Sequence, residues 1–183
     1  METLKNLRHY VLVTTGRTGT DLLQSFFDSH PEVLTFNGAF FFHTFWKEAK
    51  TNKTEDFRLS DFVSEFVGHF IEKFNSSYDV EERKDQLGPE KNQSIKIDLD
   101  VFKAEFLSLM EGQEKSSKNI FLAIYGAYAL CVNQDLSSKK ILLHHIHHFE
   151  KLDRYFEDFS ESKIIVMTRD PRANFLSGVV NHR

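Results

Sequence analysis

Along much of the chain, short apolar runs alternate with segments in which apolar residues recur at helical spacing. Continuous apolar stretches occur at residues 9–15 (HYVLVTT), 139–145 (KKILLHH) and 162–170 (SKIIVMTRD). Stretches of this length are typical of buried parallel strands. Because the strands alternate with helical segments, we expect an α/β domain with a parallel sheet.

The segment after the first strand has the periodicity of a helix. At residues 20–29, apolar side chains recur on one side, which we expect to be the inner face. These side chains are Leu22, Leu23, Phe26 and Phe27. Pro31 cannot continue a helix, so we expect the helix to end before it.

A second amphipathic helix is predicted at residues 60–75, where phenylalanine recurs every four positions and Ser60 is a candidate N-cap. The repeated residues are Phe62, Phe66, Phe70 and Phe74. Further helices are predicted at residues 100–110, 119–133 and 149–159, and the second of these has one apolar face. That face contains Ile120, Ile124, Ala127 and Cys131.

Three segments fit these patterns less well. Residues 36–46 (FNGAFFFHTFW) are apolar, but their pattern does not distinguish a strand from a helix. Residues 75–94 are polar and charged and are broken by Gly88 and Pro89, which is typical of a surface loop. Residues 94–100 (SIKIDLD) are predicted as a short strand.

The composition supports one globular domain with a bulky core. A chain of 183 residues can bury a core of useful size and is short for two domains. It is 40% hydrophobic and 27% charged, within the range of soluble globular proteins. Phenylalanine is abundant, at 19 copies. Because each phenylalanine buries a large area, we interpret this abundance as core rather than as an aromatic ligand pocket.

Charge and cysteine content exclude several classes of protein. The formal net charge is -4 and there is no long basic run, so we expect no nucleic-acid interface. No apolar stretch approaches the length of a membrane span. A single cysteine, Cys131, cannot form an internal disulfide. These features favour a reducing, cytoplasmic setting.

Three polar clusters follow the predicted strands. They are residues 16–21 (GRTGTD), 144–148 (HHIHH) and 169–177 (RDPRANFLS). In open parallel sheets, ligands bind outside the carboxyl ends of the strands. We therefore expect a binding site where the three clusters meet.

The first cluster has the composition of an anion-binding loop. Gly16 and Gly19 permit a tight turn and a close approach of the backbone to a ligand. Arg17 supplies a fixed cation, and Thr18 and Thr20 supply hydroxyl groups. The loop differs from the ATP-binding P-loop because no lysine follows the second glycine. The alternative interpretation is an ordinary strand–turn–helix junction with a threonine cap.

The cluster at residues 169–177 adds a second candidate anion site. Asp170 can cap a helix that begins at Pro171, and Arg169 then lies at the end of the strand. Ser177 lies roughly two helical turns further along, on nearly the same side. Arg169 and Ser177 can therefore bind one phosphate between them. The alternative is a capping aspartate and an arginine paired with a neighbouring carboxylate.

The pair of motifs GRTGTDLLQSFFDSHPEV and KIIVMTRDPRANFLSG resembles the sulfotransferase family. The resemblance implies a P-loop-like three-layer α/β domain with a central parallel sheet flanked by helices. It also implies 3′-phosphoadenylyl sulfate (PAPS) as donor and adenosine 3′,5′-bisphosphate as product. By motif position, the first loop binds the 5′-phosphosulfate, and the later Arg and Ser bind the 3′-phosphate. The residues so implied are Arg17, Thr18, Gly19, Thr20 and Asp21 for the first site and Arg169 and Ser177 for the second.

The chain departs from the family pattern in two ways. Asp21 stands where the family commonly has a second Ser or Thr, and its carboxylate would repel a bound dianion unless turned away or paired. The chain also stops at Arg183, just after the second motif, whereas family members continue with helices and a loop that closes over the nucleotide. We therefore interpret residues 1–183 as a single sulfotransferase-like domain without its C-terminal portion, either a fragment or a shortened form.

The implied reaction is in-line transfer of a sulfuryl group to an acceptor hydroxyl or amine. It needs a cation at the leaving phosphate, for which Arg17 is the candidate, and a base for the acceptor proton. Histidine titrates near neutral pH, so we expect His145, and next to it His144, to supply the base. Alternation along the strand puts these two side chains on opposite faces. The alternatives are a polar junction without chemistry and a metal site; we expect no metal, because no carboxylate or cysteine lies at ligand spacing nearby in the sequence.

Two other functions stay open at this point. A P-loop-related kinase or nucleotide-binding protein is disfavoured by the missing lysine after Gly19. A sulfotransferase-like domain that binds without catalysing transfer is favoured by Asp21 and by the early terminus. The sequence does not specify the acceptor, and a small molecule, a carbohydrate or a lipid is compatible with it.

Overall fold

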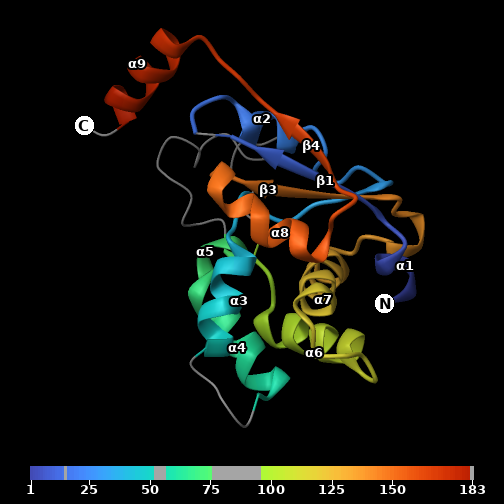
Figure 1. Ribbon diagram of the computed structural model, residues 1–183. Coiled ribbons are helices and arrows are strands. Elements are labelled where there is room, and N and C mark those ends of the chain that lie inside the picture. The colour runs from blue at the N-terminus through green and yellow to red at the C-terminus, as the bar shows by residue number, and fades with distance from the viewer. Residues whose placement is uncertain (15, 52–56, 76–95, 182–183) are drawn as a thin grey trace.

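The computed structural model describes residues 1–14, 16–51, 57–75 and 96–181 (Figure 1). Its strands are β1 (Arg8–Val13), β2 (Val33–Leu34), β3 (Ile141–Ile146) and β4 (Lys163–Val166). Its helices are α1 (Glu2–Lys5), α2 (Thr20–Ser25), α3 (Phe42–Thr51), α4 (Leu59–His69), α5 (Ile71–Phe74), α6 (Leu99–Met110), α7 (Ser117–Cys131), α8 (Leu152–Asp158) and α9 (Pro171–Asn181), with short 3-10 turns at Leu136–Ser138 and Phe149–Lys151.

The four strands form one sheet in the order β2-β3-β1-β4, and each pair is parallel. Val13, the last residue of β1, is in register with Ile146 of β3 and Val166 of β4. The carboxyl ends of these three strands therefore lie at one edge of the sheet. The loop after β1, the segment after β3 and the segment after β4 all leave the sheet there (Figure 1).

Helices flank this sheet on both faces, so the predicted α/β class with a central parallel sheet is confirmed. One face, which we call the aromatic face, carries Val11, Val13 and Leu142. The other, which we call the α2 face, carries Leu12 and Leu143. Alternation of side chains along the strands separates the two sets.

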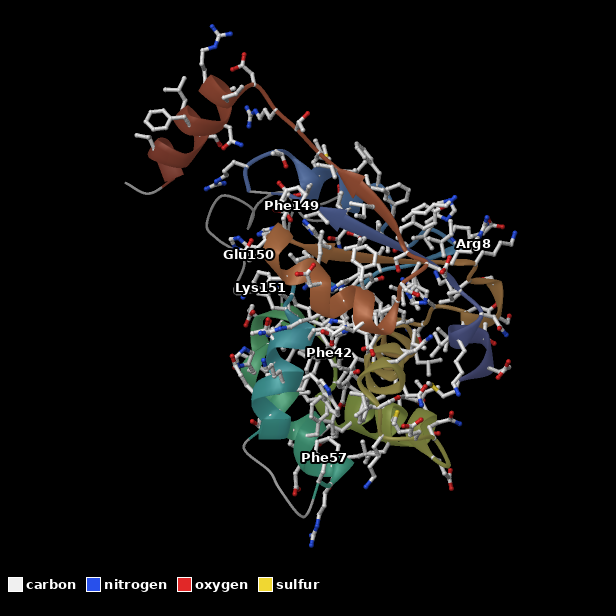
Figure 2. The ribbon with its side chains drawn as sticks, in the orientation of Figure 1. Arg8, Phe42, Phe57, Phe149, Glu150 and Lys151 are labelled. Atoms are coloured by element: carbon white, nitrogen blue, oxygen red, sulfur yellow. The ribbon has the colours of Figure 1, made fainter. Side chains whose placement is uncertain are left out.

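The aromatic face is covered by a thick layer built from α3, α4, α6, α7 and α8, and Phe42 lies within this layer (Figure 2). The centre of the layer is α7, which was expected to bury one face. Instead, residues 119–129 of α7 are all buried, because other elements surround the helix. Most of the phenylalanines lie in this layer, where they form core and do not line a ligand pocket.

The phenylalanine repeat of α4 and α5 is confirmed as part of this core. The buried members are Phe62, Phe66, Phe70 and Phe74. The helix differs from the expectation at both ends: it begins at Leu59, so Ser60 lies inside the first turn and is not the N-cap, and it is interrupted at Phe70.

The structure corrects the expectation for α2. This helix has only six residues, and it ends well before Pro31. Leu22 and Phe26 were expected to face inward, but they are 64% and 70% exposed. Leu23 and Phe27 pack against the apolar cluster of the α2 face, as expected. The most deeply buried positions of the helix are the polar Thr20 and Gln24, and Gln24 reaches His145 near the end of β3.

The three segments without a clear periodicity have different outcomes. Residues 36–41 are irregular, and α3 begins at Phe42. No strand forms in the described part of 94–100: Lys96 makes one isolated bridge with Asn75, and Asp98 caps α6 through the amides of Asp100 and Val101. The predicted surface loop at 75–94 falls, after Asn75, outside the described residues.

None of the helices in the described ranges combines the length and the apolar character needed to cross a bilayer.

Candidate functional site

The loop after β1 is drawn into a tight turn by its own threonines. Thr14 Oγ1 is hydrogen-bonded to Thr18 Oγ1, and both side chains are buried. Thr14 Oγ1 also accepts a hydrogen bond from the amide of Gly16 at 3.0 Å. Gly16, Arg17 and Gly19 have φ of 96, 54 and 89°, in the left-handed region. The two glycines adopt this conformation without steric strain, whereas the backbone of Arg17 is strained by its side chain.

The segment after β4 packs directly against this loop. Arg169 Nη1 donates to the carbonyl oxygen of Arg17 at 3.3 Å, and Asn174 Nδ2 donates to that of Gly16 at 3.1 Å. A methyl group added at Gly19 would lie 3.9 Å from Met167 Cε. The two motifs are therefore in contact, although 152 residues separate Arg169 from Arg17.

Helix α9 begins as the sequence predicts. Pro171 is its first residue, and Asp170 Oδ1 accepts a hydrogen bond from the amide of Arg172 at 2.8 Å. The Arg172 guanidinium also binds this carboxylate, and these hydrogen bonds lower the pKa of Asp170. The carboxylate of Asp170 is therefore engaged within α9, by the amide and the guanidinium of Arg172. Arg169 forms its hydrogen bond with the loop after β1 instead.

Ser177 lies on the same side of α9 as Asn174, a residue that the sequence alone did not identify. Asn174 holds the loop carbonyl of Gly16, and Ser177 follows it by three positions, so that the two share one face of the helix. Phe175 and Leu176 on other faces are 70% and 62% exposed. A hydrogen-bonding asparagine in a helix carries no signal in the sequence that would have identified it.

His144 and His145 point to opposite faces of β3, as alternation predicts. His144 lies on the aromatic face, where Nδ1 is hydrogen-bonded to the hydroxyl of Tyr125 at 2.8 Å. Its ring is stacked on Tyr155, with centroids 5.2 Å apart, and edge-on to Phe121. Burial in this aromatic layer holds the pKa of His144 well below its usual value. The structure thus places His144 inside the core.

His145 lies on the α2 face, and Gln24 fixes its ring. The amide nitrogen of Gln24 donates to the carbonyl oxygen of Phe36, which can only accept. The amide oxygen of Gln24 must therefore face His145, whose Nδ1 is 2.7 Å away and donates its proton. This bond leaves the lone pair of the imidazole on Nε2. Burial, and next the neighbouring His147, lower the pKa of His145 to about 4, so the ring is neutral at physiological pH.

Asp21 is the acidic partner of these histidines. From the first turn of α2, its Oδ1 lies 3.8 Å from Nδ1 of His145 and 3.9 Å from Nε2 of His147. The expectation of no metal rested on the lack of a carboxylate at ligand spacing close to the histidines in the sequence, whereas the fold brings Asp21 close to two of them in space. Asp21 is far from the cluster in the chain, and it reaches the histidines because β1 and β3 are neighbours in the sheet.

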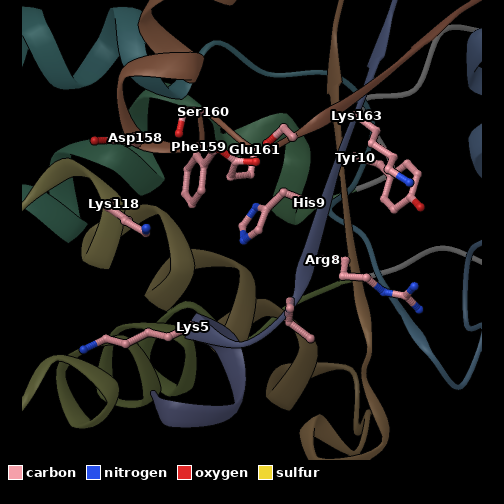
Figure 3. A pocket seen from close by; sticks show the side chains of 12 residues that line it. Lys5, Arg8, His9, Tyr10, Lys118, Asp158, Phe159, Ser160, Glu161 and Lys163 are labelled. Atoms are coloured by element: carbon pink, nitrogen blue, oxygen red, sulfur yellow. The ribbon is translucent and has the colours of Figure 1, made fainter.

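A separate cavity of about 400 Å³ opens at the opposite edge of the sheet (Figure 3). It is lined by Arg8 and His9 at the start of β1, by Lys163 at the start of β4 and by Lys118 of α7. Ligands in parallel α/β sheets bind at the carboxyl ends of the strands, and this cavity lies at the amino ends. We therefore place the candidate site at the carboxyl edge.

Fold and site together define an α/β domain that gathers a positively charged loop, a helix start and two histidines at the carboxyl edge of its parallel sheet. A sequence profile of the sulfotransferase family matches residues 11–183. This match includes both motifs and nearly all of the chain, and the protein therefore belongs to the sulfotransferase family. No curated protein and no solved structure gives a significant match.

Proposed function

We propose that the protein transfers a sulfuryl group from PAPS to a hydroxyl or amine of an acceptor molecule. The observation that carries the proposal is the contact between the two motifs, through Arg169 and Asn174 to the carbonyl oxygens of Arg17 and Gly16. A donor with phosphate groups on both the 5′ and the 3′ oxygen of its ribose needs two anion-binding segments held at a fixed separation. Membership of the sulfotransferase family supports the same reaction.

In this proposal, the loop after β1 holds the 5′-phosphosulfate, through Arg17 and the hydroxyls of Thr18 and Thr20, with Gly19 allowing the close approach of the backbone. Arg169 and Ser177 hold the 3′-phosphate. Arginine suits both sites, because its charge is permanent and its planar group donates two parallel hydrogen bonds to a phosphate. Arg17 also stabilises the charge that develops on the leaving phosphate oxygen.

His145 is the proposed base, and its neutral ring carries the necessary lone pair on Nε2. The acceptor oxygen forms its bond to sulfur while the bond from sulfur to the phosphate oxygen breaks, and His145 takes the acceptor proton. A weak base suffices, because the acceptor hydroxyl becomes strongly acidic as its oxygen bonds to sulfur. Gln24 is a positioning residue, since it holds Nδ1 protonated. His144 would be available for this role only if the aromatic layer around it opened.

The donor site is tested by calorimetric titration with adenosine 3′,5′-bisphosphate. We expect wild-type protein to bind it and Arg17→Ala or Arg169→Ala to weaken binding by roughly 10- to 100-fold, the worth of one hydrogen-bonded charge. The matched control is Arg8→Ala, an exposed arginine at the amino end of β1. If the wild type does not bind the bisphosphate, or the Arg17 and Arg169 variants bind it as tightly as the control does, the proposal is wrong.

Transfer itself is tested with donor labelled in the sulfuryl group and a panel of sugars, phenols, lipids and peptides. Appearance of label in an acceptor, and its loss in His145→Asn, supports catalysis. Binding of the bisphosphate without transfer to any acceptor would favour the non-catalytic alternative, for which the carboxylate of Asp21 beside the site is the structural argument. Tighter binding of ATP with Mg²⁺ than of the bisphosphate would favour a kinase.

A further inference from the structure

Three side chains from distant parts of the chain converge at the carboxyl end of β3. Asp21 comes from α2, His145 from β3 and His147 from the residue after the strand. Each offers one ligand atom, and these atoms all lie within 4.8 Å of one another. Oδ1 of Asp21 is 3.8 Å from the His145 ring at Nδ1, the nitrogen that donates to Gln24, and 3.9 Å from Nε2 of His147.

Both imidazoles carry a nitrogen for which the described residues supply no hydrogen-bond partner. These atoms are Nε2 of His145 and Nε2 of His147, and both are buried. The side chain of His145 is only 1% exposed. Buried polar atoms are nearly always hydrogen-bonded, so two such atoms in one cluster call for a ligand.

The surroundings of His145 match those of a metal-bound histidine. Its Nδ1 donates to the amide oxygen of Gln24, whose orientation is fixed in turn by the carbonyl oxygen of Phe36. Histidines that bind metals donate their second ring nitrogen in this way, and the bond fixes which nitrogen can coordinate. Gln24 therefore prepares Nε2 of His145 as an electron-pair donor before any ligand arrives.

We propose that Asp21, His145 and His147 form a binding site for a divalent transition metal ion, with Zn²⁺ as the leading case. Two imidazoles and one carboxylate are a donor set that suits Zn²⁺, Co²⁺, Ni²⁺ or Cu²⁺, whereas Mg²⁺ and Ca²⁺ prefer oxygen ligands alone. Coordination through Nε2 of His145, at metal–ligand distances of about 2.0–2.2 Å, requires the side chains of Asp21 and His147 to move toward that nitrogen. The side chains of Asp21 and His147 are partly exposed, at 43% and 38%, whereas that of His145 is buried and held by Gln24.

Metal binding has a consequence that rests on the proposed function. The ion would occupy the lone pair of His145 that the proposed transfer reaction uses, so Zn²⁺ would inhibit transfer. Binding of the ion does not depend on that reaction, because it requires only the three ligands. A protein that binds the metal but catalyses no transfer would support the metal site and count against the proposed function.

The test is a titration of the protein, freed of any affinity tag, with Co²⁺, followed by its visible ligand-field absorption and then by displacement with Zn²⁺. We expect one Co²⁺ per chain. Asp21→Asn and His147→Gln each remove a ligand and should weaken binding by roughly 10- to 100-fold or more. Gln24→Leu removes the bond that orients His145 and should weaken it by roughly 10-fold.

The matched control is His148→Gln, which removes an exposed histidine next in the chain to His147 and should leave Co²⁺ binding unchanged. Circular dichroism establishes that each variant is folded. The proposal fails if wild-type protein develops no ligand-field bands. It also fails if Asp21→Asn and His147→Gln bind Co²⁺ as the wild type does, or if His148→Gln weakens binding as much as they do.

Discussion

The layers that cover the two faces of the sheet differ in thickness and in chemistry. On the aromatic face, the strands are covered by α3, α4, α6, α7 and α8, whose apolar side chains form one continuous core. On the α2 face, a short helix covers a small cluster around Leu12, Val33 and Leu143, and the buried side of that helix is polar at Thr20 and Gln24. One face supplies most of the buried apolar area, and the other carries the groups that we propose to act on a ligand.

His144 and His145 show the same contrast within two consecutive residues. Each is almost fully buried and has one hydrogen-bonded ring nitrogen. His144 is enclosed by Tyr125, Tyr155 and Phe121, so its ring is part of the packing. His145 faces Gln24 and Asp21, at the edge where the two motifs meet. Burial alone therefore does not separate the two histidines, and the proposal that His145 acts on a ligand rests on its neighbours.

The largest expected effect is on stability, from truncation of the aromatic face. Phe121 is fully buried and its ring contacts those of Phe40, Tyr125 and Phe159. Phe121→Ala should lower the free energy of unfolding by about 3–5 kcal/mol, because it removes buried contacts and leaves a cavity. Phe27→Ala, on the α2 face, removes a half-buried ring and should cost about 1–2 kcal/mol.

Urea denaturation measures both values, and Phe121→Leu replaces the alanine variant if that variant does not fold. Equal losses of unfolding free energy in Phe121→Ala and Phe27→Ala would contradict the difference in thickness between the layers on the two faces.

A smaller effect is expected from acid. His9 is stacked on Phe159 on the aromatic face, and burial, then Lys118, lower its pKa from 6.5 to about 4. Above pH 6.5, the ring is neutral in the folded and in the unfolded state. As the pH falls below 6.5, the unfolded chain takes up a proton that the folded chain does not, so stability is lost. The loss from this group should reach about 2 kcal/mol at pH 5.

His9→Phe should therefore make the free energy of unfolding less dependent on pH between 6.5 and 5, as measured by urea denaturation at several pH values. His148→Gln, at an exposed position, is the control. If His9→Phe loses as much stability in this interval as the wild type, the ring is not held neutral by the aromatic face.

The elements that periodicity defines were predictable from the sequence. Strands β1, β3 and β4, helix α6 and the Asp170 cap of α9 follow from apolar runs and from local capping chemistry, which depend on neighbours in the chain. The two-residue strand β2 is too short to show such a pattern and was not predicted. The inner face of α2 was predicted only in part: Leu23 and Phe27 pack against the apolar cluster of the α2 face, as expected. The burial of Gln24 was missed because it depends on hydrogen bonds to Phe36 and from His145, which lie in other parts of the chain.

The motifs were likewise visible in the sequence, whereas the contacts that join them were not. Arg17 and Arg169 stand in recognisable patterns, but Asn174 and Gln24 are common polar residues in helices. The approach of Asp21 to His145 and His147 depends on which strands are neighbours in the sheet, and a single sequence does not reveal strand order.

The division of roles between the two faces is tested most directly by the side-chain ¹⁵N resonances of the histidines during titration with adenosine 3′,5′-bisphosphate. Before addition, His145 should show a protonated Nδ1 and an unprotonated Nε2. On binding, the resonances of His145 and His147 should shift, and those of His144 should stay in place. A shift of His144 without one of His145 or His147, or no histidine shift at saturation, would contradict the placement of the site on the α2 face.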